Sequence, residues 1–422
     1  MTTDQPPVTT SGVSSSRRNL ITLFAVAVLI GFGGAIYEVA LPLFLKQAGL
    51  SWRTMGWIYG AGAIVTFLAR VALGAWSDRV GRKLIYVWSL LLTGVATTVT
   101  PFFAGAWAQA AFKSVTDPLS RVRDAMYSVL LYETWTTGFQ RIFSKTRGVE
   151  FLFHFVGLLA TAGILGWIAR QNVGPPHVWA IAAAGILLLV SGVMFAALYR
   201  ENPLPSPARP IVSWRDLIRL QLTRPMWVLT ISFFVFNFGI TVSHSFALQL
   251  FFQEKYGATD SQIFVIGALH RLSSALTLLF LGHVFRDRLR FWLMLFVVLE
   301  GVFLAAPGFL PAAGPYRFGV LVLPALWTAV AVWLAHDFLG MGLWLPIQQI
   351  LILRHSRPES RGEEISLSTA IAALGCVPAP FVAGWLRAFP GLTGDFAVNL
   401  PFIVSGIGVA ASAIILLWLP KE

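Results

Sequence analysis

Four charged side chains recur within one apolar stretch of the chain. Lys113, Asp117, Arg121 and Asp124 are spaced four, four and three residues apart, so a helix would place them on one face. An ionised group in apolar surroundings is costly unless it meets water, an opposite charge or a ligand. Two interpretations remain open. The face is a binding site for a solute or a proton, or it is a ladder in which Asp117 pairs with Lys113 and Arg121 and fixes the helix.

Four more ionisable residues interrupt other apolar stretches. Glu38 and Asp337 are carboxylic acids that can exchange protons with water, and they are candidates for coupling solute movement to protons. Arg271 stays charged even when buried, so it either holds an anion or pairs with an acid. His244 is a further candidate for the proton or substrate site, or else an interior histidine satisfied by hydrogen bonds.

Several other chemistries have no pattern in the sequence. The histidines and the single cysteine, Cys376, do not form a cluster with the spacing of metal ligands, so we predict no metal. A phosphate-binding loop of the type Gly-x-x-x-x-Gly-Lys-Ser/Thr is absent from the sequence. We therefore predict no ATP-driven work. No soluble domain is long enough to hold an enzyme, so we expect neither an enzyme nor a cofactor.

The composition shows what kind of element carries these residues. The chain is 56% hydrophobic and only 12% charged, whereas soluble domains have about 25% charged residues. Crossing a bilayer takes about 20 residues of helix. Twelve such segments are predicted, at 20–45, 54–76, 83–104, 107–132, 148–170, 177–199, 226–250, 261–284, 291–311, 319–344, 364–387 and 398–419.

The positive charges predict the orientation. With twelve crossings both termini lie on one side, and 20 of the 31 lysines and arginines lie there, against 6 on the other side and 5 inside segments. Positive residues accumulate on the cytoplasmic side, so both termini are predicted to be cytoplasmic. The net charge of +12 is thus explained by membrane orientation, and no nucleic-acid partner is expected.

The chain divides into two similar parts. Residues 1–18 read as a disordered cytoplasmic tail, 19–199 as a first six-helix half and 226–422 as a second. Between them, 200–225 form a proline-rich loop with a short amphipathic helix. A weak repeat at an offset of 208 residues pairs Gly49 with Gly257 and Gly74 with Gly282. Duplicated halves are common in transporters.

The sequence after the second segment reads Gly74-Ala-Trp-Ser-Asp78-Arg79-Val-Gly81-Arg82-Lys83. It resembles the signature of the major facilitator superfamily, which occupies the loop between helices two and three. The resemblance covers nearly the whole chain in architecture and implies an all-α membrane fold of twelve helices in two six-helix halves. It also implies that Asp78, with Arg79 and Arg82, contacts the start of helix eleven near 361–364 and stabilises the outward-facing state.

The resemblance implies a secondary transporter that moves a small solute by alternating access. We expect proton coupling through Glu38, Asp117 or Asp337. An anionic solute suits Arg121 and Arg271, while a cationic or amphipathic one suits Glu38 and Asp117, so the sequence leaves substrate and direction open. A non-transporting receptor or scaffold, or a lipid flippase, are the alternatives. The expected setting is a monomer in the plasma (inner) membrane, with a small molecule, protons and the lipid bilayer as partners.

Overall fold

The structure is a computed structural model of the chain. It describes residues 10–135, 139–171, 176–200, 222–281, 284–285, 287–357, 361–389, 391–392 and 394–420. The predicted amphipathic helix of the central loop lies outside these residues. Helix α1 begins at Thr10, so part of the segment predicted as a disordered tail is helical.

Twelve helical passages run through the described part of the chain, three of them broken. The first half contains α1 (Thr10–Gln47), α2 (Trp52–Val80), α3 (Arg82–Val99), α4 (Ala106–Thr134), α5 (Phe139–Gln171) and α6 (Pro176–Leu198). The second contains α8 (Arg224–His244) continued by α9 (Ala247–Tyr256), α10 (Asp260–Phe280), α11 (Leu289–Phe309), α12 (Ala325–His336) continued by α13 (Gly342–His355), α14 (Arg361–Ala373) continued by α15 (Ala379–Arg387), and α16 (Gly394–Ile415).

Ten of these passages, searched over the described residues, are long and apolar enough to cross a membrane. The two that do not qualify are α2 and α4. Helix α4 has 29 residues, but it includes the Lys113 to Asp124 face and so carries too many charges. Helix α2 also has 29 residues, but the side chains of 70–79 lie outside the description. Both helices have the length of a membrane passage.

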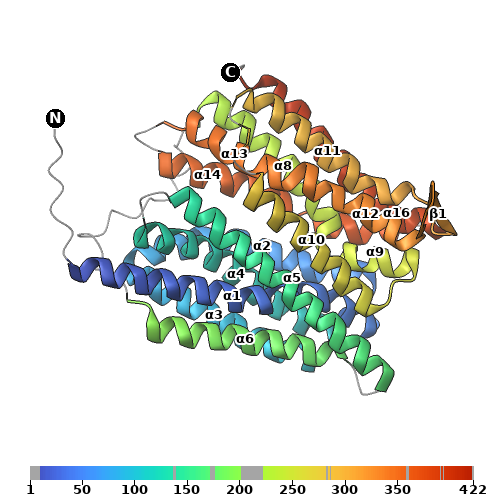
Figure 1. Cartoon of the computed structure of the whole chain (residues 1–422), viewed down its shortest axis with the longest axis horizontal. Helices are drawn as coiled ribbons and strands as arrows, with labels where there is room; N and C mark the ends of the chain where they lie inside the picture. Colours follow the sequence, from blue (N-terminus) through green and yellow to red (C-terminus); the bar gives the residue numbers. More distant parts are fainter. Residues whose placement is uncertain are drawn as a thin grey trace.

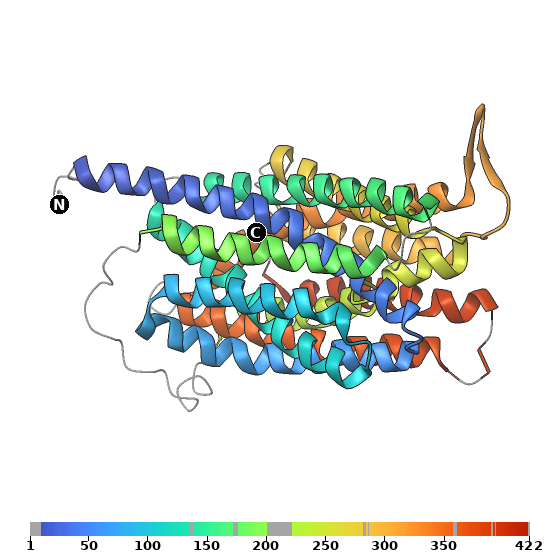
Figure 2. The same cartoon turned by 90° about the horizontal axis from the view of Figure 1, so that it is seen from below.

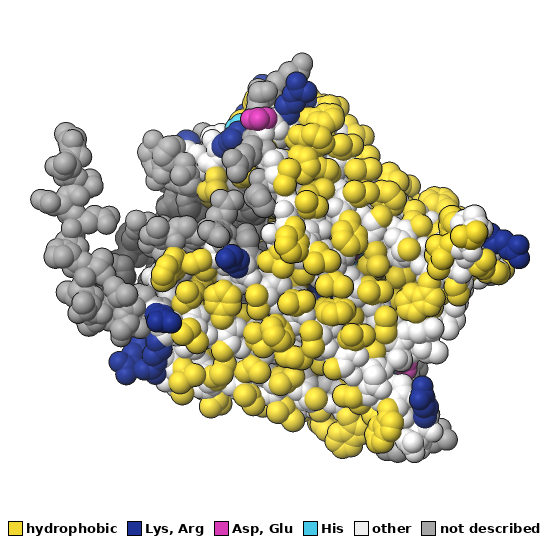
Figure 3. Space-filling model, viewed as in Figure 1, with side chains coloured by type: hydrophobic (Ala, Val, Ile, Leu, Met, Phe, Trp, Pro, Cys, Tyr) yellow, Lys and Arg dark blue, Asp and Glu magenta, His cyan; other side chains and the backbone are white. Residues whose placement is uncertain are grey.

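The arrangement of the helices agrees with a membrane setting. The first half, coloured blue to green, lies beside the second half, coloured yellow to red, and α5 runs along α10 where they meet (Figure 1). Apolar side chains cover the broad face seen in Figure 3, and lysines and arginines gather toward its edges. Exposed Trp57, Trp167 and Trp179 belong to this outer surface. Lipid is the solvent that such a surface fits.

A short hairpin marks one end of the molecule. Strands β1 (Pro315–Phe318) and β2 (Leu321–Pro324) pair antiparallel, with Gly319 at φ +63° in the turn. The hairpin projects at the end opposite the amino terminus (Figure 2). We call this end the hairpin side and the other the terminal side. The sequence prediction placed part of the hairpin in a helix starting at 319, which is wrong, because the helix begins at Ala325.

The tenth passage changes its winding in the middle. Helix α12 ends at His336, a π-helix (η2, Asp337–Met341) follows, and α13 continues to His355. Two glycines of this region, Gly340 and Gly342, lie against Glu300 and Thr277 with no room for a larger side chain. Short π-helical turns inside α-helices occur frequently at functional sites. The turn places Asp337 in the interior of the second half, where it is fully buried.

Candidate functional site

The two halves are joined by polar contacts on the hairpin side. The carboxylate of Glu254 (α9) accepts a hydrogen bond from the Trp52 indole at 3.0 Å and forms ion pairs with Lys46 at 3.2 Å and Arg387 at 3.1 Å. Lys46 and Trp52 belong to the first half, whereas Glu254 and Arg387 belong to the second. Beside them, Lys255 donates to two backbone carbonyls of α11, and burial lowers its pKa to about 8.

Two further contacts bridge the halves near the same end. His177 lies 2.9 Å from the Asp260 carboxylate, and the Ser261 hydroxyl donates to the carbonyl of Ala162 at 2.8 Å. The close approach of α2 and α15 adds to them, since a Cβ at Gly56 would lie 2.6 Å from the Pro380 carbonyl. The hairpin side is therefore closed.

One ion pair connects the halves in the middle of the helices. Glu38 (α1) and Arg271 (α10) are 2.6 Å apart, and the Arg271 guanidinium lies over the Phe151 ring. The Glu38 side chain is 61% exposed although its neighbours Tyr37 and Val39 are buried. Because its partner comes from the other half, this exposed carboxylate faces the space between the halves. The sequence proposed Glu38 and Arg271 separately, and the structure brings them together.

The predicted charged face of α4 is only partly a ladder. Lys113 and Asp117 form an ion pair at 2.8 Å, and the Lys113 ammonium lies 4.3 Å from the centre of the Tyr59 ring. Arg121 is exposed and has no hydrogen-bond or ion-pair partner in the part of the chain that the structure describes. The predicted pairing of Asp117 with Arg121 is thus not seen. Asp124 is the acid that acts most strongly on the Arg121 guanidinium, ahead of Glu38 and Asp117.

A second set of charges lies deeper in the first half. Arg123 contacts Asp124 at 3.3 Å, and Arg147 contacts Glu150 at 2.8 Å. These four residues line a small recess together with Tyr86 and Tyr127. Arg147 lies just before the predicted segment 148–170, but helix α5 begins at Phe139 and includes it. Every acid in this set has an arginine partner, which suits a structural role.

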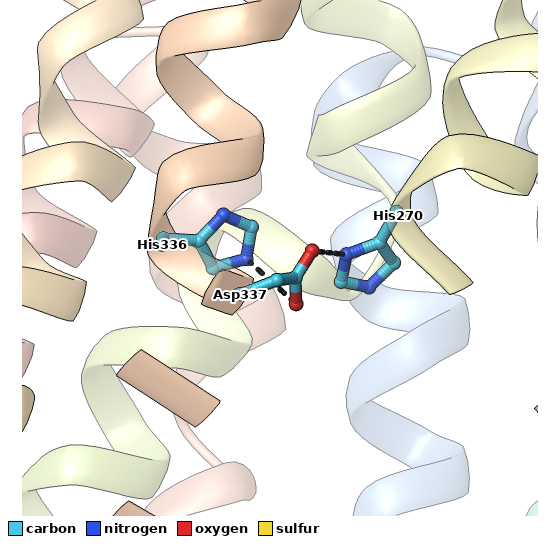
Figure 4. Close-up of side chains that lie close together, drawn as sticks. All are labelled: His270, His336 and Asp337. Atoms are coloured by element: carbon cyan, nitrogen blue, oxygen red, sulfur yellow. Dashed lines mark hydrogen bonds and ion pairs between the residues drawn. The ribbon is translucent and has the colours of Figure 1, made fainter. Parts of the chain in front are cut away.

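The second half contains a different cluster (Figure 4). The Asp337 carboxylate lies 2.5 Å from His270 Nδ1 and accepts hydrogen bonds from Ser273 at 2.8 Å and Ser274 at 2.9 Å. His336 Nε2 is 3.7 Å from the same carboxylate. One ligand-type atom from each of His270, His336 and Asp337 lies within 4.8 Å of the others, and all three residues are buried.

Aromatic rings close this cluster on one side. The ring of His244 lies 5.8 Å from that of His270 and 5.5 Å from that of His336, and the buried Trp333 ring packs against His270 and His336. His244 Nδ1 is 2.9 Å from the Ser243 hydroxyl. Two of the predicted candidates, His244 and Asp337, therefore belong to one cluster. His270 of this cluster is followed in the chain by Arg271, the partner of Glu38.

Comparison of sequences relates the chain to known membrane proteins. Residues 14–123 match the sequence model described as Major Facilitator Superfamily. The chain is 24% identical to "Uncharacterized MFS-type transporter YceJ" of Bacillus subtilis (strain 168), over 89% of this chain and 92% of the relative. It is 27% identical to "Multidrug resistance protein 2" of the same organism, over 54% of this chain and 56% of the relative.

The whole fold also matches solved transporters. A mutant of the nucleoside transporter NupG gives a TM-score of 0.76 at 11% identity, covering 95% of this chain and 100% of the other. The amino-terminal quarter of the chain thus matches the major facilitator superfamily in sequence, and the whole chain resembles solved transporters in fold. The human organic anion transporter MFSD10 (TETRAN) has a TM-score of 0.66 at 16% identity over 98% and 100% of the chains. The predicted all-α membrane fold is confirmed, and the prediction of a transporter rather than an enzyme agrees with these similarities.

The superfamily motif lies at the junction of α2 and α3. Gly81 has φ +96°, a value that only glycine adopts readily, and it ends one helix and starts the next. Arg82 forms an ion pair with Glu133 of α4. The side chains of Gly74, Asp78 and Arg79 lie outside the described residues. In the segment that the resemblance places against this motif, Glu364 of α14 is buried. Its carboxylate accepts a hydrogen bond from the backbone N–H of Arg357.

Sequence reasoning missed some residues that the structure makes prominent. Glu254 was not proposed, although it is the centre of the hairpin-side contacts, because an acid near a helix end carries no distinctive pattern. Ser273 and Ser274 were missed as well. Their position three and four residues after His270 on α10 is a signal that could have linked them to that histidine.

Proposed function

We propose that the protein is a secondary transporter that carries a small organic anion by alternating access, coupled to proton movement. The observation that carries the proposal is Arg121, an exposed guanidinium inside a membrane passage without a partner among the described residues. An arginine keeps its charge in such a place, and charged groups inside membrane passages usually face the protein interior or a water-filled cavity and mark a substrate or ion pathway. A negatively charged solute supplies the missing partner.

The balance of charges near Arg121 supports an anion rather than a cation. Lys113 is neutralised by Asp117, and Arg271 is neutralised by Glu38. Of these three positive side chains, Arg121 is the one without an ion-pair partner among the described residues. A cationic solute would have to displace Lys113 or Arg271 from its acid, whereas an anion needs no existing pair to break. The names of the relatives and structural neighbours range over multidrug, nucleoside and organic anion transporters, and the last of these is consistent with this class.

The closed hairpin side supports alternating access. Contacts around Glu254 and between His177 and Asp260 hold the halves together at one end. Transporters with repeated halves expose a central site to each side in turn by rocking one half against the other. With the termini in the cytoplasm of a cell whose plasma membrane holds the protein, as the positive charges favour, the state seen is closed to the outside. The gating role of Asp78, Arg79 and Arg82 belongs to the opposite state.

The Glu38–Arg271 pair is the element that we assign to proton coupling. It joins the halves, and its carboxylate is exposed to the space where a solute would enter. Protonation of Glu38 removes its charge, which weakens the bridge and frees Arg271 as a second anion-binding group. A proton and an anion then favour the same rearrangement, which is the condition for coupling. In this scheme Asp117 neutralises Lys113, and Asp337 belongs to the histidine cluster and takes no part in proton coupling.

The test begins with ligand binding. Purified protein is screened by thermal unfolding against a panel of carboxylates, phosphate esters and sulfonates, since a ligand of the folded state raises the melting temperature. For the anion that binds best, Arg121→Gln should weaken binding at least tenfold with little change in the melting temperature of the free protein, and Arg121→Lys should weaken it less.

The anion found in the screen is then followed in proteoliposomes. Uptake should be stimulated by a proton gradient and accompanied by alkalinisation of the donor side. The matched control is Arg170→Gln, which removes an exposed arginine at the hairpin-side end of α5 and should leave uptake unchanged. Binding only of cations, or anion uptake that Arg121→Gln leaves intact, contradicts the anion site. Transport without proton movement contradicts the coupling alone, and binding without any transport supports a receptor instead.

A further inference from the structure

The acid of the buried cluster in the second half has no permanently charged partner among the described residues. Asp337 has no exposed surface, and its contacts within the described part of the chain come from two serines and two histidines, with no lysine or arginine. A carboxylate in such surroundings must be balanced by a positive charge. Glu300 on α11 lies nearby, and its Oε1 is buried without a partner among the described residues.

The tautomer of His336 shows where this positive charge belongs. His336 Nδ1 contacts the backbone carbonyl of Trp333, and a carbonyl only accepts, so Nδ1 carries the proton. In the neutral ring Nε2 then presents its lone pair. That lone pair lies 3.7 Å from Asp337 Oδ1, so two electron-rich atoms face each other. A cation between them removes the repulsion.

The separation of these two atoms distinguishes a metal ion from a shared proton. A hydrogen bond between nitrogen and oxygen needs about 2.7–3.2 Å, which is shorter than the 3.7 Å observed. Two ligands of a tetrahedral zinc ion, each about 2.0–2.1 Å from the metal, lie about 3.3 Å apart. The gap therefore fits a pair of ligands on one ion better than a hydrogen bond.

We propose that His270, His336 and Asp337 bind a divalent transition-metal ion such as Zn²⁺ in the interior of the second half. Imidazole and carboxylate are the ligands of catalytic and structural zinc. A bond from the other ring nitrogen of a ligand histidine to a backbone carbonyl is the usual support of such a ligand, and His336 has it. His270 joins by exchanging its bond to Asp337 for the metal and releasing a proton.

The remaining geometry is consistent with a four-ligand site. His244 has its Nδ1 beside the Ser243 hydroxyl, and its ring lies within 6 Å of the rings of His270 and His336. The hydroxyls of Ser273 and Ser274 hold the Asp337 carboxylate in place. These ligands all lie in one half, so the ion does not need to be released when the halves rock.

The experiment uses the full chain without a histidine tag, stripped with a chelator and desalted. After incubation with ZnCl₂ and a second desalting, elemental analysis should find about one zinc ion per chain, and zinc should raise the melting temperature by several degrees. Co²⁺ in place of zinc should give the visible absorption band of tetrahedral cobalt. His336→Ala and Asp337→Asn should each lower the affinity at least tenfold.

The matched control is His154→Ala, which removes a buried histidine of the first half and should leave the stoichiometry and the cobalt spectrum unchanged. If Asp337→Asn does not fold, the cobalt spectrum of the wild type and of His336→Ala decides. A wild-type protein that retains no zinc, or retention that His336→Ala leaves unchanged, overturns the proposal. In the first case the cation at Asp337 is a proton. The measurement does not depend on transport, so it stands apart from the test of the anion site.

Discussion

The two halves of the molecule neutralise their intramembrane acids in different ways. In the first half Asp117, Asp124 and Glu150 each lie beside a lysine or arginine. In the second half Asp337 is surrounded by histidines and serines, and Glu300 accepts from the Trp344 indole. A lysine or arginine paired with an acid keeps its charge near neutral pH, whereas histidine can gain a proton or bind a metal there. The first half therefore holds fixed charges, and the second half holds groups whose charge can change.

The sharpest way to test this difference is to remove one acid from each half. Asp337→Ala deletes a fully buried carboxylate with several hydrogen bonds and should lower the free energy of unfolding by about 3–5 kcal/mol. Asp117→Ala removes a 28% exposed side chain and should cost about 1.5 kcal/mol. Denaturant titration in mixed micelles measures both. Equal losses would show that the two environments do not differ.

A smaller effect is expected where the halves meet on the hairpin side. Glu254→Gln removes the ion pairs to Lys46 and Arg387 but keeps an acceptor for Trp52. Because the carboxylate is partly exposed, the substitution should destabilise the closed state by about 1 kcal/mol. The ratio of closed to open molecules should then fall about fivefold. Faster hydrogen–deuterium exchange at the hairpin-side ends of α2 and α15 would report it. Unchanged exchange would mean that apolar packing alone closes this side.

The smallest change in stability is expected in the middle of the interface. Glu38→Gln and Arg271→Gln break a pair whose acid is mostly exposed, so a double-mutant cycle should give a coupling energy of about 0.5 kcal/mol. The effect on transport should be larger, because Glu38→Gln should leave solute exchange but abolish accumulation driven by a proton gradient. If the Glu38→Gln variant still accumulates solute in response to a proton gradient, the coupling residue lies in the second half instead.

Much of the fold follows from the sequence because length and hydropathy decide membrane helices. The charged face of α4 was visible in the residue pattern, whereas the break in the tenth passage was not predicted. The hairpin was not, because Val320 to Val322 are apolar and look like the start of the following helix. The Asp337 cluster was not visible either, since His270 and Asp337 are 67 residues apart. Only the packing of α10 against the π-helix brings them together.

The same limit applies to pairing between the halves. Arg271 and Glu38 were each identified as costly charges, but the sequence holds no information on which of them meet across 233 residues. Arg121 illustrates the reverse case. Its spacing from Asp117 predicts a partner, and the helix geometry permits one, yet Asp117 pairs with Lys113 instead. Which of two equally spaced neighbours a side chain pairs with depends on the tertiary packing around it.

The single cysteine gives the molecule a built-in reporter. Cys376 lies in a short 3₁₀ turn (η3, Leu374–Cys376) that links α14 to α15, is partly exposed, and accepts a hydrogen bond from the Thr241 hydroxyl. If the proposed alternating access holds, the rate at which a maleimide dye modifies this thiol should change when a transported anion is added. The native, unmutated chain can then be used to follow the rearrangement.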